Sequence, residues 1–319
     1  MPIPFNTTAL VAAVNKRRPV RTPIKDAHFS RTVLENTDSV QLDIKTGPEG
    51  IAVAISRGTK SRRADKSGWD TITVTIPHFS EHDLIKASDL IGARAFGKTT
   101  TETMAAKVAE KLDTLRAKFD RTQEFMCIKA LQGQVVDGSG NVIASYQVPA
   151  PIAASVSNGT DNPQDIFLDA STTISRALGS DPGNVTAYMG LTAYKALLAS
   201  PFVDAERKNA NQGNVQVQFQ NGLLTNVGGT NIRLMPAVYI DNTGTEVPFL
   251  PDADVIIVSD AMGGEMVYGP AETPNGPLMT PYFADSWDER DPAGTMIRVE
   301  TNPLPLVTRP DAIARYTFA

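Results

Sequence analysis

Four residues occupy the fixed positions of the pattern G-x-x-x-x-G-K-[ST], which is typical of phosphate-binding loops: Gly92, Gly97, Lys98 and Thr99. In such a loop, backbone N–H groups and a helix N-terminus bind phosphates, while the lysine and the hydroxyl contact the terminal phosphates and magnesium. The loop should follow a buried parallel strand, but residues 84–91 have the apolar spacing of a helix. We therefore favour a glycine hinge before a capped helix and keep a P-loop nucleotide-binding protein as the alternative.

No further catalytic or metal-binding motif accompanies this pattern. His78 and His82 stand four residues apart, which would place them on one helix face, but no third ligand is near in sequence. The only cysteine, Cys127, has no histidine near it in sequence, so we interpret it as a structural thiol. We predict no catalytic residues, no cofactor and no metal site, and hence a protein that is not an enzyme.

The composition is that of a globular protein with enough chain for about two domains. Of its 319 residues, 41% are apolar and 20% are charged, and the net charge is −5. The apolar runs are too short to span a membrane, and the N-terminus lacks the apolar core of a secretory signal. We expect a cytosolic-type protein with no membrane partner, whose net charge gives no overall reason to bind nucleic acid.

Charge is distributed unevenly along the chain. Residues 1–132 carry 21 Lys/Arg and 15 Asp/Glu, whereas residues 211–295 carry 2 and 11. The most basic stretch, residues 56–68, has no apolar side chain larger than alanine. Its basic residues are Arg57, Lys60, Arg62, Arg63 and Lys66. Because this stretch cannot bury a core of its own, we predict a solvated or partner-bound loop.

The first 35 residues resemble an extended arm more than the start of a domain. Prolines interrupt regular structure, and five basic residues precede the first acid. These basic residues are Lys16, Arg17, Arg18, Arg21 and Lys25. We predict that the arm lies on another surface and adds few side chains to the core, so a subunit without residues 1–25 should still fold.

The clearest element is one long amphipathic helix over residues 99–132. Its start fits a capping box, and its apolar residues recur at steps of three and four with one gap at Thr122. The stripe consists of Met104, Val108, Leu112, Leu115, Phe119 and Met126. At 1.5 Å per residue the helix is about 50 Å long, which suggests a structural spine.

The rest of the chain predicts a mixture of strands and helices. Period-two alternation indicates strands within residues 39–76, with a turn at residues 46–50. A turn-rich stretch over residues 133–163 marks a domain boundary. After it we predict a helix at 164–178 with a stripe of Ile166, Leu168, Ile174 and Leu178, a helix at 192–199, a hairpin turn at Asn221-Gly222, and strands at 185–189, 232–240 and 254–258. Residues 277–319 return to β-structure around a turn at 291–294, so the fold class is α+β.

The carboxyl-terminal sequence from Ser286 to Ala312, SWDERDPAGTMIRVETNPLPLVTRPDA, resembles the end of the lambda-type major capsid proteins of tailed phages, the major capsid protein E family. Near the amino end, Pro23, Ile24 and Phe29 are similar to the P-I-x-x-x-x-F segment of that family. The order of arm, β-loop, long helix, α+β region and β return also matches. The resemblance is specific at the carboxyl end and architectural elsewhere.

The resemblance implies the tailed-phage major capsid fold, divided into five regions along the chain. They are an N-terminal arm (1–36), an extended β-hairpin loop (37–80), a peripheral domain with the spine helix (81–155), an axial domain (156–276), and a C-terminal β return to the peripheral domain (277–319). The residue pattern Gly92 to Thr99 then becomes the entry to the spine helix.

The function implied is that of a shell protein that self-assembles as hexamers and pentamers around packaged double-stranded DNA. The implied partners are other copies of the chain, a scaffold protein, a portal protein and a decoration protein, in the virion capsid and, before assembly, the bacterial host cytoplasm. A tail or decoration protein is a third hypothesis, disfavoured because such chains rarely need a long spine helix. As interface candidates we take the basic residues of the loop and arm named above, Lys25 excepted. The loop would meet acidic residues 241–291 of a neighbouring copy or, alternatively, the packaged DNA.

Overall fold

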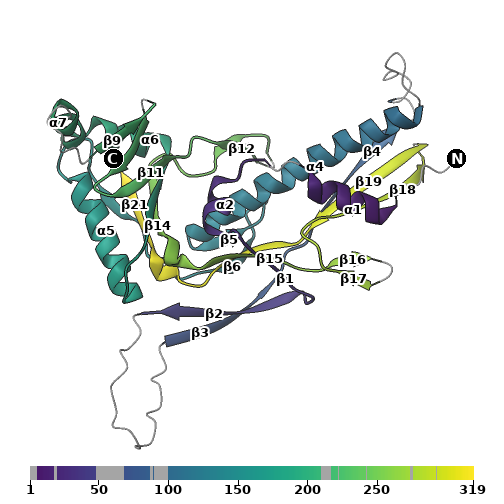
Figure 1. The fold of residues 1–319 in the computed structure, drawn as a ribbon, viewed down its shortest axis with the longest axis horizontal. Helices are drawn as coiled ribbons and strands as arrows, with labels where there is room; N and C mark the ends of the chain where they lie inside the picture. The colour runs from purple at the N-terminus through teal and green to yellow at the C-terminus, as the bar shows by residue number, and fades with distance from the viewer. Residues whose placement is uncertain are drawn as a thin grey trace, which may run out of the picture. The chain divides into compact units, whose positions relative to one another are not determined.

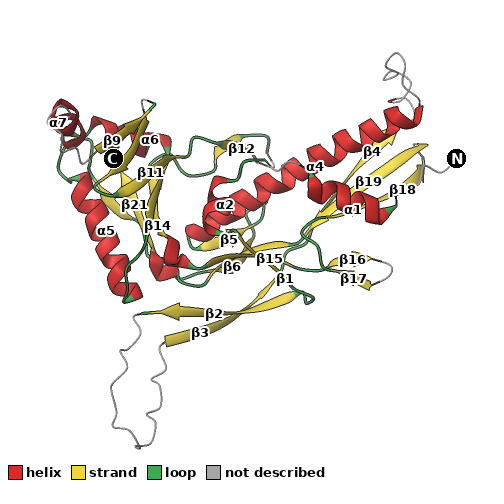
Figure 2. Cartoon of the chain, in the orientation of Figure 1, coloured by secondary structure: helices red, strands yellow, loops and turns green. Residues whose placement is uncertain are grey.

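A computed structural model describes residues 6–17, 20–47, 68–86, 89, 100–209, 217–221, 223–241, 243–273, 276–291 and 293–319. The chain divides into two compact units, each built from discontinuous segments. Unit 1 contains residues 1–40, 73–127 and 265–306, and unit 2 contains residues 41–72, 128–264 and 307–319. Both units combine helices with sheets, as Figure 2 shows, so the predicted α+β class is confirmed.

Unit 1 is built on a three-stranded antiparallel sheet and one long helix. The strands are β18 (Phe283–Arg290), β19 (Ala293–Thr301) and β4 (Phe79–Lys86), in the order β18-β19-β4. The helix α4 (Thr100–Leu131) packs on one face of this sheet (Figure 1). All six residues of the predicted apolar stripe are buried, and five of them join a core with Ile297 and Val299 of β19. The spine helix and its buried face are therefore as predicted.

The described residues of the N-terminal segment, 6–17 and 20–29, form two helices where we expected an extended arm. They are α1 (Thr7–Lys16) and α2 (Pro23–His28). Leu10 and Val14 of α1 lie in the same core as the stripe of α4, and Ile24 is fully buried. The expectation of few core side chains was wrong, because the helical spacing of Leu10 and Val14 puts both on the face that meets the sheet.

A second correction concerns the residues before Gly92. We assigned residues 84–91 to a helix, but Leu84 and Ile85 belong to strand β4. The pairing decides the matter, because every residue of β4 has a partner on β19, from Phe79↔Thr301 to Lys86↔Gly294. Since β4 pairs antiparallel and ends the described order of its sheet, it still differs from the buried parallel strand of a phosphate-binding loop.

Unit 1 also contains smaller sheets. The strand β1 (Arg31–Leu34) pairs parallel with β15 (Gly264–Tyr268), which neighbours β20 (Pro303–Val307). The strands β16 (Ala271–Thr273) and β17 (Gly276–Leu278) form a short hairpin. A further two-stranded sheet pairs β2 (Ser39–Thr46) with β3 (Gly68–Thr75) and is called here the β2–β3 hairpin. Its residues 41–46 and 68–72 belong to unit 2, and only the strand ends at its root belong to unit 1. Leu42, Ile44 and Val74 are buried in the predicted alternation.

Unit 2 is built on a seven-stranded mixed sheet in the order β7-β21-β14-β8-β11-β10-β9. Its strands are β7 (Ile152–Ala154), β8 (Val185–Met189), β9 (Val217–Gln220), β10 (Leu223–Val227), β11 (Thr230–Leu234), β14 (Asp254–Ser259) and β21 (Ile313–Phe318). The hairpin β9–β10 turns at Asn221, whose φ of 51° is left-handed, as the predicted turn requires. The C-terminal strand β21 joins this sheet, whereas β18 to β20 lie almost wholly in unit 1.

Three helices of unit 2 accompany this sheet: α5 (Pro163–Leu178), α6 (Leu191–Ala199) and α7 (Pro201–Asn209). The smaller elements are β5 (Gln134–Val136), β6 (Val142–Ser145), β12 (Val238–Ile240), β13 (Glu246–Pro248), and the 3₁₀ turns Asp260–Met262 and Pro310–Ala312. Helices at 164–178 and 192–199 were predicted within one residue of these bounds.

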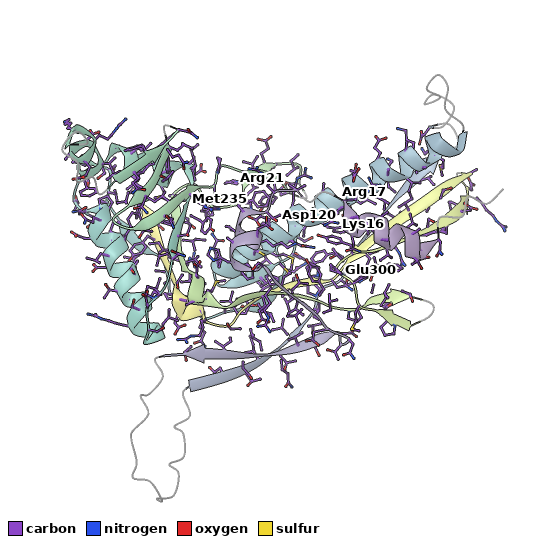
Figure 3. All side chains as sticks on the ribbon, viewed as in Figure 1. Lys16, Arg17, Arg21, Asp120, Met235 and Glu300 are labelled. Carbon is purple, nitrogen blue, oxygen red and sulfur yellow. The ribbon has the colours of Figure 1, made fainter. Side chains whose placement is uncertain are left out.

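Two details of unit 2 differ from the sequence predictions. Leu168 is 62% exposed, and Phe167 takes its place in the buried stripe of α5. The steps from Phe167 to Ala170 and Ile174 follow the helical period, which Leu168 does not. The single strand predicted at 232–240 is two strands: β11 ends at Leu234, and Met235, labelled in Figure 3, still donates its N–H to Met189 O at 2.9 Å. Pro236 follows and has no N–H to continue the pairing.

Candidate functional site

The basic residues predicted to form subunit contacts are partly visible in the structure. Lys16 and Arg21 are exposed, whereas Arg17 donates to Asp113 of α4 at 3.2 Å. Figure 3 labels these three basic residues together with Asp120 of α4. Arg18, Arg57, Lys60, Arg62, Arg63 and Lys66 lie outside the described residues. The pairing of Arg17 within its own chain shows that one candidate already has a partner in the subunit.

That ion pair is one end of a larger feature, which we call the polar clamp. It consists of five α4 side chains that contact the N-terminal segment: Asp113, Arg116, Asp120, Gln123 and Glu124. Their steps of three, four, three and one place them along one side of the helix. Each of them bonds to backbone groups or polar side chains of residues 14–25. The clamp therefore fixes the path of a segment 100 residues distant in sequence.

Glu124 caps the N-terminus of α2. Its Oε1 accepts from Ile24 N and its Oε2 from Lys25 N, both at 2.9 Å. Pro23 has no N–H, and Asp26 N donates to Thr22 O at 2.8 Å. The two donors left over in the first turn are thus the two that Glu124 accepts. Thr22 makes no side-chain cap bond, so the carboxylate of another helix does the work of a local cap.

Arg116 and Asp120 hold the link between α1 and α2. Arg116 donates to the carbonyl of Val14 in the last turn of α1, and its guanidinium lies 4.5 Å from the ring centre of Tyr282. Asp120 Oδ2 accepts from Val20 N at 3.0 Å, while Oδ1 accepts from the Tyr282 hydroxyl. Arg116 thus places a cation at the carbonyl end of α1, and Glu124 places an anion at the amide end of α2, which matches the two helix dipoles.

Gln123 completes the clamp from a fully buried position. Its Oε1 accepts from Lys25 Nζ and from the Tyr268 hydroxyl, and its Nε2 donates to Thr301 Oγ1 at 3.4 Å. The amide therefore joins α2 to β15 and β19. A buried amide that uses both its oxygen and its nitrogen rigidifies the site, because leaving either unpaired costs free energy.

The environment shifts the titration of several groups on and around α4. Burial raises the pKa of Glu124, an effect that the hydrogen bonds from Lys25 N and Ile24 N partly offset. Burial also raises the pKa of the Cys127 thiol well above its ordinary value, with a further contribution from Glu124. A thiol that stays protonated and fully buried is not a nucleophile, which agrees with the structural role predicted for it.

Sequence reasoning missed the polar clamp because it followed only the apolar stripe of α4. The stripe has a gap at Thr122, and the next two residues, Gln123 and Glu124, are buried polar side chains. Charged residues at Arg116, Asp120 and Glu124 repeat every four positions, which was the available signal. Their partners could not be found, since they are backbone groups of a segment that carries no pairing pattern.

The described residues give little support to the other functions considered from the sequence, such as metal binding. There, no group of three or more His, Cys, Asp or Glu residues is placed to hold a metal ion. His78 precedes β4 and His82 lies within it, so the helical pair we considered does not form. In the same part of the chain, no helix combines the length and hydropathy of a membrane span. The four residues of the phosphate-binding pattern lie outside the described residues.

Comparison with known proteins decides the family. The model of a family described as phage major capsid protein E matches residues 6–318. The chain belongs to the phage major capsid protein E family. The match spans the polar clamp, both units and the carboxyl-terminal sequence that carried the resemblance. The prediction of a tailed-phage major capsid protein is thus confirmed, and the nucleotide-binding alternative has no support.

Individual relatives of this capsid protein agree. A major capsid protein of Pseudomonas phage KPP10 is 25% identical over 248 residues, which cover 66% of this chain and 71% of that protein. A crystal structure of a putative capsid protein of a prophage of E. coli CFT073 has a TM-score of 0.66 at 16% identity, covering 99% of both chains. The mature capsid of bacteriophage PhiM1 gives a TM-score of 0.51 at 14% identity, covering 94% of this chain and 88% of that one. The two structures show that the fold is that of phage capsid proteins.

Proposed function

We propose that this capsid protein assembles as hexamers and pentamers into the closed icosahedral shell of a phage head around packaged double-stranded DNA. The family match over residues 6–318 carries the proposal, and the likeness to a subunit of a mature capsid supports it. Assembly takes place in the bacterial host cytoplasm with a scaffold protein and a portal protein, and a decoration protein binds the finished shell. The chain has no catalytic role in this scheme.

Purified chain examined by negative-stain electron microscopy tests the assembly. We expect rings of five or six subunits or closed shells, because copies of one surface repeat around each axis. Co-expression with the scaffold gene of the same phage should raise the fraction of closed, uniform shells. Particles that remain single subunits at every concentration, with and without scaffold, would contradict the proposal.

Subunit contacts are proposed for the basic residues of loop 56–68 and for Lys16, Arg17, Arg18 and Arg21. The loop would meet acids of residues 241–291 on a neighbouring copy. Among the described residues of that range, six acids are exposed: Glu246, Asp252, Asp260, Glu272, Asp288 and Asp291. Each exposed pair contributes only about 0–1 kcal/mol, but a closed shell repeats every pair in each subunit. Salt should weaken such contacts.

Charge reversal in the loop distinguishes its two candidate partners, a neighbouring subunit and the packaged DNA. If the loop contacts other subunits, Arg62→Glu with Arg63→Glu should reduce the yield of empty shells, and trypsin should cut the loop in free subunits more readily than in shells. A matched control reverses Lys107 and Lys111, two half-buried cations of α4. Normal empty shells combined with defective DNA-filled heads would assign the loop to DNA instead.

The phosphate-binding pattern from Gly92 to Thr99 was the one motif that suggested an enzyme, so we test for catalysis there. Lys98→Ala should leave shell assembly intact, and purified wild-type protein should show no magnesium-dependent ATP hydrolysis. An ATPase rate that disappears in Lys98→Ala would revive the nucleotide-binding alternative.

A further inference from the structure

A polar cavity lies at the root of the β2–β3 hairpin, within unit 1. Its volume is about 180 Å³, and it is lined by Asp38, Ile76, His78, Gly269, Pro270, Glu272 and Asn302. The hairpin root is defined by Ile76 N, which donates to Asp38 O at 2.8 Å. Ligand pockets usually enclose about 300–1,000 Å³, so this one is too small for an ordinary organic ligand. We therefore consider how the side chains around the cavity interact with one another.

Behind the cavity lies a buried carboxylate without a full set of partners. Glu300 of β19 is 1% exposed, and its Oε1 accepts no hydrogen bond from the described residues. The Nδ1 atom of His78 lies 3.5 Å from that oxygen. A buried carboxylate is costly unless a cation or several donors compensate its charge. Figure 3 labels Glu300 in its place on the sheet.

The hydrogen bonds around His78 fix which of its ring nitrogens carries a proton. Asn302 Nδ2 donates to Pro270 O at 2.6 Å, so Asn302 Oδ1 is the atom that faces His78 Nδ1, at 3.0 Å. That oxygen can only accept, so Nδ1 carries the proton in the neutral ring. The His78 side chain is 57% exposed, so solvent can deliver a second proton to Nε2 without disturbing these bonds.

Three acidic residues lie around His78: Asp38 before β2 and Glu272 on β16 line the same cavity, and Glu300 on β19 lies beside the ring. Arg298, two residues before Glu300 on β19, is the nearest cation along that strand, and its guanidinium lies 5.5 Å from the ring centre of Phe283. Protonated His78 would place a cation directly beside the Glu300 carboxylate. We propose that His78 and Glu300 form a proton-operated latch at the root of the β2–β3 hairpin, which closes when His78 carries its second ring proton. Closing gives the buried carboxylate its counter-ion, and opening removes it.

Hydrogen exchange of the full-length, unassembled protein tests the latch. Protection of residues 73–76, corrected for intrinsic exchange, is compared at about pH 5.5 and about pH 8, on either side of the range in which histidine titrates. We expect wild type to be several-fold more protected at the lower pH. His78→Gln should lose this extra protection while matching wild type at the higher pH. Glu300→Gln should show similar protection at both values, because no buried charge then needs a cation.

His82→Gln is the matched control, since His82 is exposed on β4 and does not line the cavity. It should retain the wild-type dependence on pH. Equal protection of wild type at both pH values overturns the latch. So does a pH dependence that survives either His78→Gln or Glu300→Gln, or one that disappears in His82→Gln. Because the His78 side chain is 57% exposed, we expect the His78→Gln variant to fold. If the Glu300→Gln variant does not fold, the comparison of wild type with His78→Gln is sufficient to test the latch.

Discussion

Two helices of this capsid protein begin in opposite ways. Helix α5 supplies its own signals: Asn162 Oδ1 accepts from Gln164 N at 3.0 Å, Pro163 follows the cap, and Gly179 ends the helix with a left-handed φ of 68°. Helix α2 has a proline in its first turn but no side-chain cap of its own, and Glu124 supplies one from α4. A locally capped helix can be predicted from its sequence, whereas α2 depends on the polar clamp.

The largest effect should come from removing the clamped segment altogether. Deletion of residues 1–25 removes Leu10, Val14 and Ile24, which are buried in unit 1 and stabilise it by about 1.5–3 kcal/mol each. We expect the truncated chain to lose the cooperative thermal transition of unit 1 or to be insoluble. A folded, soluble truncated subunit with an unchanged melt would restore the original expectation of an independent arm.

Breaking the distant cap should be the next largest effect. Glu124→Ala leaves Ile24 N and Lys25 N without an acceptor, and each unsatisfied buried donor costs about 1–3 kcal/mol. Chemical denaturation should therefore show a loss of about 3 kcal/mol. Glu110→Ala, on the exposed side of the same helix, is the control and should leave stability unchanged. Equal effects of the two variants would mean that α2 does not need Glu124.

The local cap of α5 should be worth less than the distant one. Asn162→Ala removes one hydrogen bond at an exposed helix end, for which we expect a loss of about 1 kcal/mol, also by chemical denaturation. Asn162→Ser keeps an acceptor and should restore most of the stability. A loss larger than that of Glu124→Ala would reverse the ranking of the two helices.

The contribution of the polar clamp to the stability of the protein should also depend on pH. Because burial raises the pKa of Glu124, the folded state holds its proton more tightly than the unfolded state does. Its contribution to stability is then greatest in acid and is lost as pH rises through the ordinary glutamate pKa, about 4.3, to the raised folded value. The melting temperature of wild type minus that of Glu124→Gln should therefore fall between about pH 4 and about pH 7. A rising difference would show that the N–H bonds outweigh burial.

The smallest effect is expected at the exposed end of the clamp. Arg17→Ala removes a half-exposed ion pair with Asp113, which should contribute about 0–1 kcal/mol and less at high salt. Thermal unfolding at two salt concentrations checks this. A loss that is large and independent of salt would place Arg17 among the buried members of the clamp.

Periodicity and turn chemistry in the sequence alone determined several elements of this protein. The stripe from Met104 to Met126 predicted α4, Gly179 predicted the end of α5, and Asn221-Gly222 predicted the β9–β10 hairpin. Each of these signals is local, because it is read from the spacing or type of residues within one helix or one turn. The carboxyl-terminal motif predicted the family in the same direct way, without any knowledge of contacts.

Only the tertiary structure decided where Leu84 and Ile85 belong and how residues 6–29 are held. A short apolar stretch fits a helix or a strand equally, and the pairing of β4 with β19 selects the strand. Likewise, no local pattern in residues 20–25 indicates that their backbone N–H groups are satisfied by Asp120 and Glu124, about 100 residues away. A backbone donor is the same in every residue but proline, so its partner is chosen by the fold and leaves no mark in the sequence around it.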